Sequence, residues 1–175
     1  GYDIPWEIRL APDSSLWVTE RYGRFTRYDL ATGDIDTLLD RSGSIYASGE
    51  AGMLGFAFGP GFSGTGSSTD SVFLVYCFIQ NNTIYERLSV FQYDGDDLIN
   101  ETILLDTLPA SSIHNGSRVH FLDDGTLLLT TGEKGTPFLA QDFYSLGGKV
   151  LRLNPDGTIP ADNPFPGSYV YSLGH

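Results

Sequence analysis

The sequence has almost no cysteine and few positive charges, and each shortage excludes a class of protein. Its 175 residues include one cysteine, Cys77, so no disulfide can form within the chain and no cysteine-rich metal site is available. Lys and Arg number 10 against 22 Asp and Glu, which gives a formal net charge of −12. Such a surface repels phosphate backbones, so we expect neither nucleic acid nor an anionic membrane as a partner.

The chain also lacks long apolar runs and sustained helical periods. No run reaches the ~20 apolar residues needed to cross a bilayer, so we expect no membrane span. The best helix candidate, residues 139–146, is one or two turns long at most. The sequence starts at Gly1, without an initiator methionine or a signal peptide, and we therefore expect a processed chain or a fragment.

Glycine and short apolar strands are abundant instead. The 21 Gly and 9 Pro, with only 18% charged residues, favour an all-β chain. Similar strands, "LWVTE", "VFLVYC" and "LLLTTG", begin at residues 16, 72 and 127, which is one repeat every 55 or 56 residues. Each is followed by a second apolar-alternating strand that ends in a turn with Asp or Asn, at 23–34, 88–97 and 148–158.

Each repeat supplies about four short antiparallel strands, a pattern typical of β-propeller blades. We therefore predict an all-β partial propeller over residues 1–175, with approximate blades at 1–45, 46–110 and 111–175. Propellers close with ~4–8 blades, so three blades form an open arc that needs a missing half or a second copy of the chain. A β-sandwich is the less favoured alternative, because sandwiches rarely show such a repeat.

Two glycine-containing loops carry the best candidates for chemistry. In "GEAGMLGFAFGP" and "IHNGSRVHFLDD", Glu50 and His114 each stand two residues before a glycine that leads into a strand. Such loops converge on the axis of a propeller, so we expect the carboxylate and the imidazole to face one pocket. Imidazole, with a reference pKa of ~6.5, is a natural base near neutral pH. A third candidate loop, residues 130–142, contains Glu133 and Lys134, for which the alternative is an exposed turn pair that contributes little.

A set of longer motifs then points to a known family. The motifs "PWEIRLAPDSSLWVTERYGRFTRYD", "GEAGMLGFAFGPGF", "HNGSR", "TTGEKG", "LGGKVLRLNPDGTIPADNPF" and "YSLGH" follow one another over nearly the whole chain. In this order they resemble the N-terminal half of the soluble glucose/sorbosone (aldose sugar) dehydrogenases that depend on pyrroloquinoline quinone (PQQ). The resemblance implies a six-bladed propeller, of which this chain is half, in the periplasm or outside the cell.

The resemblance also implies a reaction. An aldose sugar would be oxidised at its anomeric hydroxyl to the lactone, with His114 as the general base and hydride passing to PQQ. Glu50 and Arg118 would bind the sugar, calcium would activate the quinone, and an external electron acceptor would take the electrons. Ligands of PQQ and calcium would lie mostly beyond residue 175, so we assign no cofactor or metal ligand here and expect the isolated chain to be inactive.

Two residues depart from the family pattern. Ser117 replaces the usual second glycine after the histidine, and Ile113 stands where some members have an acidic residue that could orient the imidazole. Both departures favour an alternative from another class, a secreted propeller that binds carbohydrate or protein without turnover.

Overall fold

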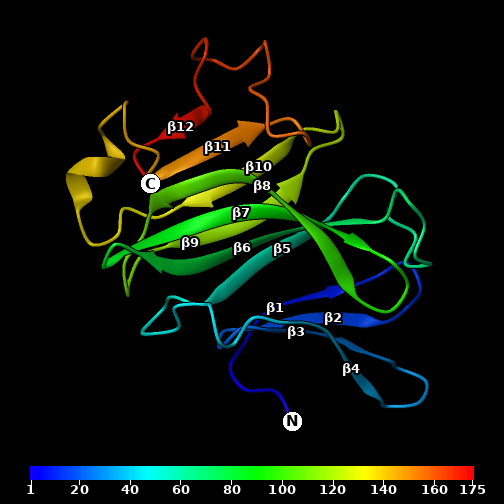
Figure 1. Ribbon diagram of the computed structural model, residues 1–175. Helices are drawn as coiled ribbons and strands as arrows, with labels where there is room; N and C mark the ends of the chain where they lie inside the picture. Colours follow the sequence, from blue (N-terminus) through cyan, green and yellow to red (C-terminus); the bar gives the residue numbers. More distant parts are fainter.

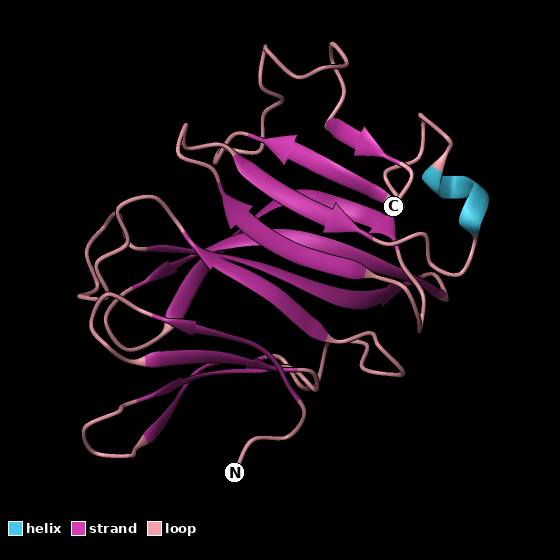
Figure 2. Ribbon diagram, turned by 180° about the vertical axis from the view of Figure 1, so that it is seen from behind, coloured by secondary structure: helices cyan, strands magenta, loops and turns pink.

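The computed structural model describes all 175 residues, and the chain forms three four-stranded antiparallel sheets (Figures 1 and 2). The strands pair in chain order within each sheet. The first sheet contains β1 (Pro5–Leu10), β2 (Leu16–Glu20), β3 (Arg24–Tyr28) and β4 (Ile35–Asp40); the second contains β5 (Met53–Phe58), β6 (Ser71–Gln80), β7 (Thr83–Tyr93) and β8 (Leu98–Pro109); the third contains β9 (Gly116–Phe121), β10 (Leu127–Thr131), β11 (Lys149–Leu153) and β12 (Val170–Leu173). The predicted all-β class and its four-stranded antiparallel units are confirmed.

The three sheets follow one another like a fan, from the blue N-terminal sheet to the yellow-to-red C-terminal sheet (Figure 1). The first strand of each sheet is the innermost, and β5 lies between β1 and β9, in contact with both. The fourth strand of each sheet, β4, β8 or β12, forms its outer edge. Because all inner strands begin at the same end, the loops that enter them gather there.

Burial along the strands explains why they form. In β9, Ser117 and Val119 are buried, whereas Arg118 and His120 are exposed, which is the alternation of a strand with one covered face. In β6 the residues from Val72 to Cys77 are all buried. The second sheet has a neighbouring sheet on each side, so a nearly continuous apolar run is what its central strand requires.

Only one short helix interrupts the strands, the cyan segment in Figure 2. It is the 3₁₀ helix η1, Pro137–Ala140, and not the segment 139–146 that the sequence suggested. Pro137 explains the earlier start, because its fixed φ and missing N–H are tolerated in a first helical turn. No helix of the chain is both long and apolar enough to cross a membrane.

The hydrophobic core is divided between the two interfaces that join the sheets. The first and second sheets enclose a cluster of 13 buried residues, in which the Trp17 ring meets four other aromatic rings at centroid distances of 5.0–5.7 Å. The second and third sheets enclose 12 buried residues, nearly all of them Leu and Val. Together the two clusters hold each sheet in a fixed position relative to its neighbour, and so position the loops that form the site.

Candidate active site

Two loops that cross from one sheet to the next meet at the end where the inner strands begin. The loop between β4 and β5 carries Glu50, and the loop between β8 and β9 carries His114. The Glu50 N–H donates to the Ser112 carbonyl at 2.7 Å, and the His114 N–H donates to Glu50 Oε2 at 2.6 Å. A side chain at Gly49 would come within 2.3 Å of the same carbonyl, so the glycine permits this approach. The structure thus brings Glu50 and His114 together.

The backbone of His114 is held in an unusual conformation. Its φ is 54°, in the left-handed region that residues with a β-carbon seldom adopt. The His114 carbonyl accepts the Lys134 N–H at 3.1 Å, and the neighbouring Asn115 carbonyl accepts the Gly132 N–H at 2.6 Å. The buried Asn115 amide also exchanges two hydrogen bonds with the backbone of Ser111. Strained backbone conformations that are held by several hydrogen bonds are found most often at functional sites.

The imidazole of His114 has a carboxylate partner that the sequence did not reveal. Glu133, from the loop after β10, pairs through Oε1 with His114 Nδ1, while its Oε2 accepts the Thr136 N–H at 2.6 Å. Hydrogen bonding and charge from Glu133 raise the pKa of His114 above its ordinary value, and Glu50 adds to this. The same bond lowers the pKa of Glu133.

Glu133 orients the His114 imidazole, a role that the family pattern gives in some members to an acidic residue at the position of Ile113. Ile113 lies beside Gly135, with its Cδ1 3.2 Å from the position that a β-carbon there would take. The carboxylate that orients the imidazole comes from a different loop, 19 residues further along the chain. Glu133 pairs with His114 and not with Lys134, so the alternative of an exposed Glu133–Lys134 turn pair does not hold.

The pairing decides which ring nitrogen is free. Because Nδ1 faces a carboxylate, the neutral imidazole carries its proton on Nδ1 and leaves the Nε2 lone pair available. The side chain of His114 is 54% exposed, so a small molecule can reach Nε2. The arrangement is that of a general base held in one tautomer by a carboxylate.

A cavity of about 180 Å³ lies beside these loops. It is lined by Trp6, Glu50, Leu54, Asn115 and Gly116. Arg118 stands against its wall, with the guanidinium carbon 5.2 Å from the centre of the Trp6 ring and Nη1 2.8 Å from Glu7 Oε1. The Glu7 carboxylate thus holds the Arg118 side chain next to the cavity.

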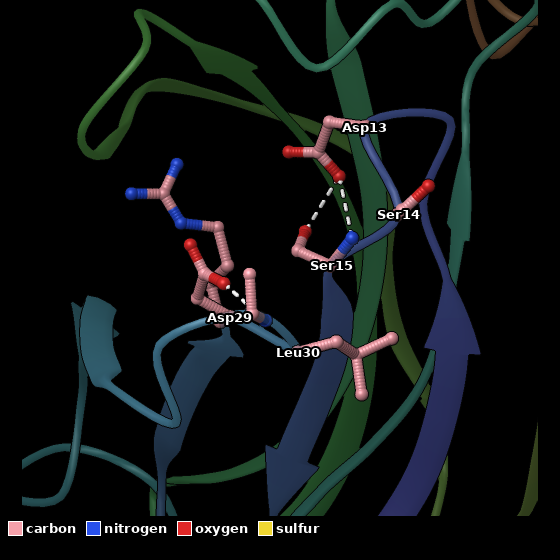
Figure 3. A pocket seen from close by; sticks show the side chains of 7 residues that line it. Asp13, Ser14, Ser15, Asp29 and Leu30 are labelled. Atoms are coloured by element: carbon pink, nitrogen blue, oxygen red, sulfur yellow. Dashed lines mark hydrogen bonds between the residues drawn. The ribbon is translucent and has the colours of Figure 1, made fainter.

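A larger cavity, of about 390 Å³, lies at the opposite end of the first sheet, where β1 and β3 end (Figure 3). Its polar groups already have partners: Asp13 accepts two hydrogen bonds from Ser15, and Asp29 accepts the Ala31 N–H. Arg27, which also lines it, pairs with Asp36. The polar groups of these loops are already hydrogen-bonded or ion-paired within the first sheet and its turns, and we therefore assign this cavity no chemistry.

No cluster of metal ligands complements the site. Nowhere in the chain do three or more His, Cys, Asp or Glu side chains gather around a point that could hold a metal ion. The buried thiol of Cys77 is not a candidate nucleophile either, because burial strongly raises its pKa. The titratable groups that these loops bring together are His114, Glu133 and Glu50.

The geometry defines the class: three consecutive blades of a β-propeller, with a histidine–carboxylate pair in the loops at one mouth of their axis. The comparison with known families agrees. The sequence profile of the Glucose / Sorbosone dehydrogenase family matches residues 2–175, and the chain belongs to this family.

Individual relatives extend this finding. Quinoprotein glucose dehydrogenase B of Acinetobacter calcoaceticus is 33% identical over 206 residues, which cover 98% of this chain and 42% of that protein. An aldose sugar dehydrogenase of Escherichia coli is 29% identical, with 93% and 44% covered. The structure of the PQQ-bound aldose sugar dehydrogenase of Streptomyces coelicolor matches with a TM-score of 0.83 and 35% identity, over 100% of this chain and 52% of that one. The chain thus spans about half the length of these relatives, and the predicted propeller fold is confirmed.

Proposed function

We propose that the protein to which this chain belongs oxidises an aldose sugar at its anomeric hydroxyl to the lactone, with PQQ as the hydride acceptor. The observation that carries the proposal is the His114 imidazole, fixed by Glu133 through Nδ1, next to a cavity lined by Glu50 and by Asn115, the residue that follows His114. Membership of the Glucose / Sorbosone dehydrogenase family and the PQQ-bound relative support the choice of reaction and quinone.

His114 takes the hydroxyl proton at Nε2. Removing this proton increases the electron density on oxygen, which makes the C–H bond at the same carbon a better hydride donor. Glu133 stabilises the imidazolium that forms. Because Glu133 raises the pKa of His114, the base is neutral only at a higher pH than a free histidine would be. Activity should therefore rise with pH through this raised value.

Glu50 and Arg118 bind the sugar in this proposal. One oxygen of Glu50 accepts the His114 N–H, and the other is available to accept a sugar hydroxyl. Arg118 offers further donors beside the flat face of Trp6. This half of the site therefore fits a polyhydroxylated ring, with acceptors, donors and an aromatic wall around one base.

The remaining requirements fall to the rest of the protein. When bound, PQQ would supply the hydride acceptor. We assign no calcium ligand to this chain, and the family implies that an activating calcium would be held mostly by the rest of the protein. An external electron acceptor and a periplasmic or extracellular location complete the proposal, and both rest on the family.

We also propose that the three sheets are half of a closed ring. Ile8 and Leu10, on the face of β1 turned away from the second sheet, are 59% and 64% exposed. Apolar side chains in such positions normally pack on the next blade. The missing half, or a second copy, would cover them, and the isolated chain should be inactive.

Replacing the base tests the proposal. In the full-length protein loaded with PQQ and calcium, dye reduction with several aldoses should show His114→Ala lowering kcat by ~10²–10⁴-fold, the usual contribution of a general base. His120→Ala is the matched control, since His120 is exposed on β9, and it should keep wild-type activity. Equal activity of His114→Ala and wild type would contradict the role of the base. Sugar binding without turnover by the wild type would instead support a non-catalytic binding propeller.

A further inference from the structure

The residue three positions after His114 combines two costly features. Ser117 has a φ of 74°, a left-handed conformation in which glycine is the unstrained choice. Its side chain is fully buried. The Ser117 carbonyl packs closely on Gly55: a β-carbon at position 55 would lie 2.0 Å from the carbonyl oxygen of Ser117. A serine in this position needs a compensating interaction.

That interaction is a hydrogen bond to a buried acid. The Ser117 hydroxyl donates to Oε1 of Glu86, which lies on β7 of the second sheet and is completely buried. No cation pairs with Glu86, and its Oε2 has no hydrogen-bond partner. The groups facing it are Cys77 on β6, Leu108 on β8 and Ser117 itself, none of them positively charged. Burial accordingly raises the pKa of Glu86 to about 8, which favours the neutral acid at pH 7.

The bond joins two blades directly behind the site. Ser117 begins β9, only Asn115 and Gly116 separate it from His114, and both of these line the cavity. We infer that Glu86 and Ser117 are positioning residues: their buried hydrogen bond ties the start of β9 to the second sheet and so fixes the His114 loop against Glu133. This inference rests on the proposed role of His114.

Its physical consequence is a loop whose geometry depends on a neutral acid. A buried carboxylic acid accepts one hydroxyl without a charge to solvate, whereas the ionised form would leave a buried charge with a single donor. The folded-state pKa lies above the ordinary 4.5, so the contribution of Glu86 to stability is complete below pH 4.5 and is lost as the pH rises toward 8.

The test uses the full-length protein without quinone or sugar, so it does not depend on turnover. At pH 4.5, where the contribution of Glu86 is complete, we expect Ser117→Ala and Glu86→Leu to lower Tm. The double variant should lower it no further than the more severe single variant, because both remove one bond. Ser117→Gly should lower Tm less than Ser117→Ala, because it also relieves the strained φ. The Tm difference between wild type and Glu86→Gln should change between pH 4.5 and pH 8. Additive losses, or a difference constant with pH, would refute the pairing.

A second measurement separates positioning from simple stabilisation. NMR titration of the labelled His114 ring should show its pKa falling toward 6.5 in Ser117→Ala, because the imidazole loses its fixed place beside Glu133. Thr19→Val is the matched control: Thr19 is a buried hydroxyl that joins the first and second sheets by donating to the Leu54 carbonyl at 2.7 Å. It should lower Tm and leave the His114 pKa in place. An unchanged His114 pKa in Ser117→Ala would overturn the inference, whether or not the protein oxidises sugars.

Discussion

The two interfaces between blades differ in the kind of apolar side chain that fills them. The interface of the first and second sheets is aromatic: seven of its 13 buried members are Trp, Phe or Tyr. The interface of the second and third sheets contains a single aromatic residue, Phe73, among 12. Buried polar groups occur at both interfaces: Thr19 joins the first and second sheets, and Glu86 joins the second and third. The third sheet also has the buried Lys149.

The difference corresponds to two roles: the first interface holds the sheets together, and the second also supports the loops of the site. Large aromatic rings that meet edge to face bury much apolar area and favour one packing arrangement. This suits an interface whose role is to hold two sheets together. The second interface bears the loops of His114 and Glu133. Polar side chains there form hydrogen bonds that hold these loops in place, which apolar side chains could not do. Mutations on the two sides should therefore have different consequences.

Trp17→Ala should have the largest effect on stability. Removing the fully buried indole leaves a cavity among four rings and should cost ~3–5 kcal/mol of unfolding free energy, measured by denaturant titration. Because the first interface carries none of the base, the pKa of His114 in the surviving folded protein should not move. A large shift in that pKa would break the division between the two interfaces.

Lys149→Met should have a smaller effect on stability but reach the site. The buried ammonium donates to the carbonyls of Leu139, Ala140 and Gly147 at 2.6–3.1 Å, and burial lowers its pKa. Leaving these carbonyls without a donor should cost ~1–3 kcal/mol. It should also loosen the loop between β10 and β11, which carries Glu133, and so lower the pKa of His114.

Lys134→Met is the control on the same loop, because its side chain makes no hydrogen bond or ion pair within the chain. Stability should change by less than ~0.5 kcal/mol, as for ordinary surface substitutions. Equal losses from Lys149→Met and Lys134→Met in thermal unfolding would count against a role for the buried ammonium.

The periodic features of the fold could be predicted from sequence, because they are local. Strands such as "LWVTE" and "LLLTT" carry their own apolar pattern, and the repeat of that pattern predicted the four-stranded sheets. The convergence of Glu50 and His114 also followed, since both precede an inner strand. The helix was placed late because its start depends on Pro137, which the apolar pattern of 139–146 does not include.

The partners within the site could not be predicted in the same way. Glu133 meets His114 because the chain after β10 folds back, which requires Gly132 to lie under the His114 carbonyl. Nothing in the letters "GEKG" distinguishes that contact from an exposed turn. Glu86 likewise sits in an ordinary alternating strand, and its burial depends on a neighbouring blade. Such contacts join residues distant in sequence, and the glycines that allow them were the only available signal.

The most direct test of the site compares the pH dependence of kcat/KM for an aldose in wild type and Glu133→Gln of the loaded full-length protein. The acidic limb reports the pKa of the base in the free enzyme. We predict a limb above pH 6.5 in wild type, because Glu133 raises the pKa of His114, and a limb shifted to lower pH in Glu133→Gln, with a reduced plateau. An acidic limb at the same pH in both proteins would contradict the assignment of His114 and Glu133 as the catalytic pair.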